Sequence, residues 1–134
     1  MSETILSILF VAHGWAHIWY IILSQQLLEI KEKVAWTGES WILTNLVDKP
    51  ALRTIAGIGY TASLIGFIAG GIALGTGHTI WKQVITASII VSSITITLFW
   101  DGKPEMLIDK GLLGLIINLA IITYLNIVNK LNIT

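Results

Sequence analysis

The chain has 134 residues; 54% of them are hydrophobic and only 12% are charged. Soluble domains carry about 25% charged residues, so this composition argues against an ordinary soluble enzyme and against a disordered chain. Eight Lys and Arg residues balance eight acidic ones, which leaves no basic excess to bind nucleic acid. The absence of cysteine excludes disulfides, thiolate metal sites and cysteine nucleophiles. The composition therefore indicates a multi-pass membrane protein.

Four uncharged runs are long enough to cross a bilayer, whose apolar core is about 30 Å thick and takes about 20 residues of helix. In chain order they are Thr4 to Leu28, Thr54 to Trp81, Gln83 to Trp100 and Gly111 to Asn129. They predict helices over about 4–27, 52–75, 79–100 and 110–129. The expected fold is all-α: an antiparallel four-helix bundle integral to the membrane, forming one domain over 1–134.

The first loop is the longest, and it contains a candidate helix start. Ser40 precedes a short apolar run and could cap a helix lying in the membrane interface near residues 40–48, with Trp41 at the headgroup level. The loops also predict orientation, because cytoplasmic loops are rich in Lys and Arg. The first and third loops hold six such residues and the other side holds two: Lys31, Lys33, Lys49, Arg53, Lys103 and Lys110 against Lys82 and Lys130. Both termini are therefore expected outside the cell membrane.

Small residues recur at four-residue spacing in the second helix. Ala62, Gly66 and Gly70 form one series, and Gly71 and Gly75 form another. Such rows let a neighbouring helix approach closely, so we expect them to face the rest of the bundle. Ala12 and Ala16 predict a similar short groove on the first helix.

The first helix also carries two histidines, His13 and His17, four residues apart and hence on one face. Three interpretations are open: neutral rings hydrogen-bonded across the bundle, a metal or haem site, and a site for a proton or polar ligand. Two histidines alone do not complete a zinc site, and a haem takes its axial ligands from opposite faces. His13 and His17 remain candidate ligands, but no metal or cofactor is assigned.

Other polar residues fall at similar depth, since a helix rises 1.5 Å per residue. His17, Tyr60, Ser93 and Asn118 are expected to form one polar layer, with His13 one turn away. An imidazole facing hydrocarbon would leave polar groups unpaired, so both rings should point into the bundle. Asp101 is the carboxylate closest to the membrane. It could cap a helix end, pair with Lys103, or orient a ring of the layer.

The motifs His13-Gly14-Trp15-Ala16-His17 and Trp100-Asp101, followed by Gly111 or Gly114 and Asn118, resemble those of a group of small four-helix membrane proteins of bacteria and archaea. The group is mostly without assigned function. The resemblance implies the four-helix fold and no particular reaction.

Two functions are open. The first is a non-catalytic accessory or structural subunit of a larger membrane complex, of respiratory or membrane-monooxygenase type, because the chain has almost no mass outside the predicted helices. The second is an intramembrane protein that binds a lipid or quinone, or a metal- or haem-dependent enzyme, using His13 and His17. The expected partners are the lipid bilayer and other membrane proteins or further copies of the chain. No catalytic residue is assigned.

Overall fold

A computed structural model describes residues 2–28, 38–105 and 107–130, and within these ranges the chain is helical, without strands. Its long helices are α1 (Glu3–Ser24), α2 (Lys49–Gly75), α3 (Trp81–Leu98) and α4 (Leu113–Lys130). A short wide turn, η1 (Ile108–Leu112), leads into α4. Four stretches of these helices are long and apolar enough to cross a membrane. The predicted all-α fold is confirmed for the described residues. Lys31 and Lys33, which the orientation prediction uses, lie outside them.

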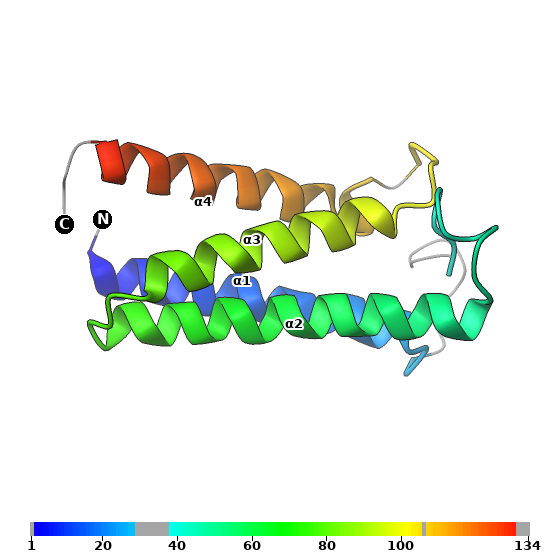
Figure 1. The fold of residues 1–134 in the computed structure, drawn as a ribbon, viewed down its shortest axis with the longest axis horizontal. Coiled ribbons are helices and arrows are strands. Elements are labelled where there is room, and N and C mark those ends of the chain that lie inside the picture. Colours follow the sequence, from blue (N-terminus) through cyan, green and yellow to red (C-terminus); the bar gives the residue numbers. More distant parts are fainter. Residues whose placement is uncertain (1, 29–37, 106, 131–134) are drawn as a thin grey trace.

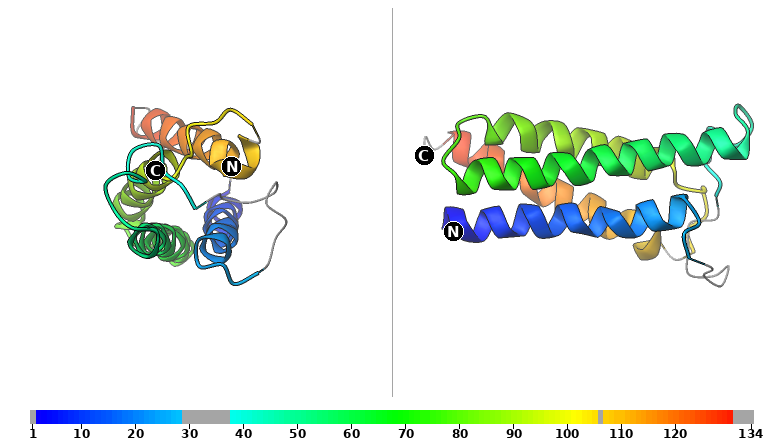
Figure 2. Two further views of the ribbon diagram at one scale, coloured as in Figure 1. Left: turned by 90° about the vertical axis from the view of Figure 1, so that its right-hand side faces the viewer. Right: turned by 90° about the horizontal axis from the view of Figure 1, so that it is seen from below.

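The four helices lie lengthwise beside one another, as Figure 1 shows. The view along the helices in Figure 2 places α2 between α1 and α3, with α4 beyond α3. The first turn of α1 and the last turn of α4 are at the same end (Figure 1).

Local sequence signals explain where the helices begin and end. Asp48 accepts a hydrogen bond from the backbone N–H of Ala51 at 2.8 Å, so α2 begins at Lys49, earlier than the predicted residue 52. Gln26 takes a positive φ of 52° just after α1, which ends there at Ser24 instead of residue 27. Gly111 has a φ of 107° inside η1, where the N–H of Leu112 reaches back five residues to the carbonyl of Leu107. The fourth helix therefore does not start as a straight helix at residue 110.

The predicted helix near residues 40–48 is wrong: residues 41–46 form hydrogen-bonded turns. Ser40 does act as a cap, because its hydroxyl oxygen accepts from the N–H of Leu43 at 3.0 Å. Ser40 and Trp41 are also tied to the end of α3, where Ser40 donates to Leu98 and Trp41 to Thr97 and Trp100. A run this short gains too little from helix propagation to offset nucleation, so these tertiary bonds determine its shape.

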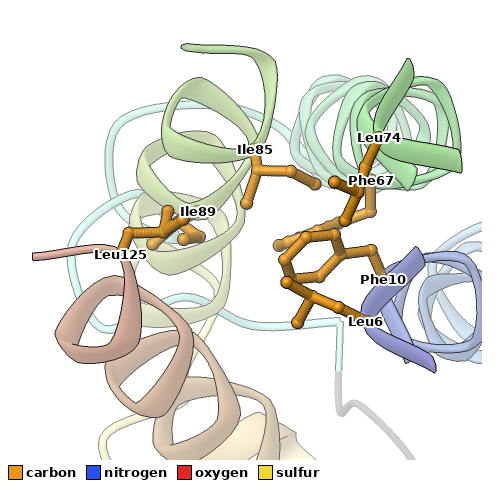
Figure 3. Packing of buried hydrophobic residues seen from close by; sticks show 7 residues of the cluster. All are labelled: Leu6, Phe10, Phe67, Leu74, Ile85, Ile89 and Leu125. Carbon is orange, nitrogen blue, oxygen red and sulfur yellow. The ribbon is translucent and has the colours of Figure 1, made fainter. Parts of the chain in front are cut away.

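Two apolar clusters fill the interior. One consists of seven residues, drawn in Figure 3: Leu6, Phe10, Phe67, Leu74, Ile85, Ile89 and Leu125. The other consists of Leu52, Ala56, Tyr60, Ile96 and Phe99. On α3 the buried Ser92 falls between Ile89 of the first cluster and Ile96 of the second. On α3 a buried polar residue thus lies between the two clusters.

The glycines of α2 contact both neighbouring helices. A Cβ on Gly70 would lie 2.5 Å from Cδ1 of Ile85 on α3, and one on Gly71 would lie 2.9 Å from the carbonyl oxygen of Ser7 on α1. Gly66 likewise faces Ser88, so the prediction that these glycines face the bundle is confirmed. Ala62 is exposed and does not share this role.

Candidate functional site: a polar layer across three helices

His13 and His17 both point into the bundle, as predicted. Their exposed fractions are 8% and 1%, and their ring centroids lie 5.3 Å apart with the rings nearly perpendicular. Phe67 of α2 packs against both rings, at 4.6 Å from His13 and 5.6 Å from His17. The pair is therefore held against an apolar wall on one side.

Hydrogen bonds connect the two rings to α3 and α4. His13 Nε2 lies 2.9 Å from Asn118 Oδ1, and Asn118 Nδ2 lies 3.0 Å from the hydroxyl oxygens of both Ser92 and Ser93. His17 Nε2 lies 2.8 Å from the Ser92 oxygen, and His17 Nδ1 lies 3.0 Å from the carbonyl oxygen of His13. Five side chains of three helices thus form one connected network with the backbone of α1.

The donor and acceptor of each bond in this network follow from one atom whose role is fixed, the backbone carbonyl oxygen of His13. A carbonyl oxygen only accepts, so Nδ1 of a neutral His17 carries the hydrogen and its Nε2 is the acceptor. The Ser92 hydroxyl therefore donates to His17, and its oxygen accepts from the amide of Asn118. The amide oxygen then faces His13, whose Nε2–H must donate to it. His13 Nδ1 is left with an unprotonated lone pair, and within the described residues it has no hydrogen-bonding partner.

The remaining predicted members of the layer take different places. Ser93 accepts from Asn118, whereas Asn118 itself bonds to His13 and not to His17, the ring placed at its depth by the sequence. Tyr60 lies beside His17 with ring centroids 6.5 Å apart, and it stacks on Tyr20 at 5.1 Å. In the described part of the chain Tyr60 makes no hydrogen bond to either histidine, so it contributes an aromatic wall.

Ser92 is the member that the site prediction left out. It is fully buried and links His17 to Asn118. A signal for it exists in the sequence, because Ser88, Ser92 and Thr95 share one helical face with the apolar Ile85, Ile89 and Ile96.

Asp101 lies apart from the layer, beyond the end of α3. Its side chain is 1% exposed, and Lys110 Nζ lies 2.9 Å from Oδ1 and 2.8 Å from Oδ2. The backbone N–H of Lys103 also donates to Oδ1 at 3.0 Å. Burial alone would raise the pKa of the Asp101 carboxyl, but the bonds and charges of Lys110 and Lys103 outweigh it and hold the pKa below its usual value. Asp101 therefore joins the end of α3 to η1, and no contact with Tyr20 or His17 is present in the described residues.

A metal would have to displace existing bonds to use both histidines, since both ring nitrogens of His17 already have partners. Among the described residues, no group of three or more His, Cys, Asp and Glu side chains is arranged to hold a metal ion. The nitrogen that could accept a ligand without such a loss is Nδ1 of His13.

Comparison with known proteins adds no identification: no family model, no curated protein and no solved structure matches this chain.

Proposed function

We propose that the protein is a multi-pass membrane protein whose four helices cross the bilayer as an antiparallel bundle. The outer surface supports this proposal. Large apolar side chains are exposed on all four helices, among them Ile8, Trp15, Ile65, Ile94 and Leu119. Soluble monomers rarely expose apolar surface of this extent, whereas lipid tails solvate it.

Within the membrane, we propose that it acts as a non-catalytic accessory or structural subunit of a larger complex. The observation that carries this is the hydrogen-bond network of His13, His17, Ser92 and Asn118, which links three helices. Each bond between two of these side chains joins different helices, as a structural layer requires. The carboxylate of Asp101 lies apart from the layer and is engaged with Lys110, so it does not orient either histidine.

Purification in a mild detergent tests this role. We expect other membrane subunits to co-purify in fixed ratio, and the visible spectrum and metal analysis to show neither haem nor stoichiometric metal. The His17→Ala variant should keep those subunits and unfold at a lower temperature, because His17 packs in the interior. Asn126→Ala, at an exposed position of α4, is the matched control.

A chain that purifies alone with one haem or metal bound would contradict the accessory role, particularly if His17→Ala lost that group while remaining folded.

A further inference from the structure

A groove of about 570 Å³ lies between α1 and α4. Its α1 side includes Leu9, Ala12 and Ala16, and its α4 side includes Ile116 and Ala120. The small alanines leave it open, and among the described residues the polar side chains that line it are those of His13 and Tyr124. Ligand pockets commonly measure about 300–1,000 Å³, so the groove can hold a small organic molecule.

His13 gives this apolar groove a specific polar group. The network described above commits its Nε2–H to Asn118 and leaves Nδ1 as a hydrogen-bond acceptor without a partner in the described residues. An acceptor that faces apolar surroundings without a partner costs free energy, which a donor brought by a ligand would recover. The matching ligand group is therefore a neutral donor such as a hydroxyl.

The depth of His13 limits the kind of molecule that can supply this hydroxyl. His13 is ten residues from the start of α1 and eleven from its end. At 1.5 Å per residue the ring lies about 15 Å from either end, near the bilayer centre. A phospholipid keeps its polar groups at the headgroup level, so it cannot place a donor there. A molecule that is apolar apart from one or two hydroxyls can.

We propose that the groove between α1 and α4 binds an apolar molecule bearing a hydroxyl of the hydroquinone or isoprenoid-alcohol class, and that this hydroxyl donates to His13 Nδ1. The proposal rests on the proposed membrane placement and adds a binding site to it. It predicts preference for a donor: a hydroquinone fits Nδ1, whereas the oxidised quinone carries only acceptors.

Binding to the purified full chain in detergent micelles tests the proposal. The probes are decylubiquinol, decylubiquinone, the dimethyl ether of decylubiquinol, and farnesol. We expect decylubiquinol to bind roughly tenfold more tightly than the quinone or the ether, the gain from one buried hydrogen bond. Farnesol binding tightly in place of decylubiquinol would identify the hydroxyl's source as an isoprenoid alcohol and support the same site.

Two variants test whether the probes bind in the groove. Ala12→Leu and Ala16→Leu fill it without touching the polar network and should weaken binding at least tenfold at unchanged thermal stability. The matched control, Ala69→Leu at an exposed position of α2, should bind as the wild type does. Equal affinity for the hydroquinone and its dimethyl ether, binding that survives both groove variants, or no binding of any probe would overturn the proposal. Such failures would not touch the accessory role, which co-purification tests separately.

Discussion

Replacing Asn118 with leucine should destabilise the protein more than any other single change in the polar layer. Asn118 is 1% exposed and makes three hydrogen bonds, to His13, Ser92 and Ser93. Hydrogen bonds between membrane helices average about 0.6 kcal/mol, so three account for about 2 kcal/mol. The substitution also leaves the His13 N–H buried without an acceptor, a further cost of about 1–2 kcal/mol. We therefore expect Asn118→Leu to lower the free energy of unfolding by about 3–4 kcal/mol.

Reversible unfolding in mixed micelles, with increasing dodecyl sulfate, measures this loss. Ser93→Ala removes one of the three bonds and should cost about 0.6 kcal/mol. Asn126→Leu makes the same replacement at an exposed position of the same helix and should leave the stability close to that of the wild type. An Asn118→Leu protein as stable as the Asn126→Leu control would refute the reasoning that this amide joins the helices.

Three further predictions concern packing, pH and topology. Gly70→Leu should lower the unfolding free energy by at least 2 kcal/mol in the same assay, because even a Cβ would meet Ile85; wild-type stability would mean that this face is not packed. Burial alone would raise the pKa of the Asp101 carboxyl, but Lys110 holds it below its ordinary value of about 3.9. The ionised carboxylate therefore stabilises the fold above that ordinary pKa, and this stability is lost as the pH falls through the lowered pKa of the folded state. Asp101→Asn should therefore cost about 3 kcal/mol at neutral pH and remove the loss of stability on the acid side, as thermal unfolding against pH will show. Single cysteines at the exposed Asn45 and Glu105 should react with a reagent confined to the cytoplasm, and one at Thr79 only with an external reagent; the reverse pattern would invert the predicted orientation.

The long helices were predictable because each is an apolar run bounded by charged residues, and lipid permits few alternatives to a helix. The residues at which these helices begin and end were harder to predict. The sequence around Asp48 carries the cap that starts α2, but the prediction began this helix later, at residue 52. The turns at 41–46 depend on bonds from Ser40 and Trp41 to α3, and local sequence does not contain such tertiary contacts.

The histidine pair was predictable for a similar reason: spacing alone puts both rings on one face, and the cost of unpaired polar groups turns that face inward. The hydrogen-bonding partner of each ring was not predictable in the same way. Counting depth along straight helices placed Asn118 beside His17, but the wide turn at Gly111 changes the start of α4, and Asn118 bonds to His13. Ala12 and Ala16 were predicted to form a groove for close helix packing, whereas the structure leaves both exposed along the opening between α1 and α4.

The measurement that tests the central claim most directly is ring ¹⁵N NMR of the histidines in lipid bilayers at neutral pH. The His78→Gln variant simplifies the spectrum, since His78 is exposed in the loop between α2 and α3. The network predicts opposite tautomers: a hydrogen on Nδ1 of His17 and on Nε2 of His13, with His13 Nδ1 unprotonated. The same tautomer on both rings, or two doubly protonated rings, would contradict the layer as described.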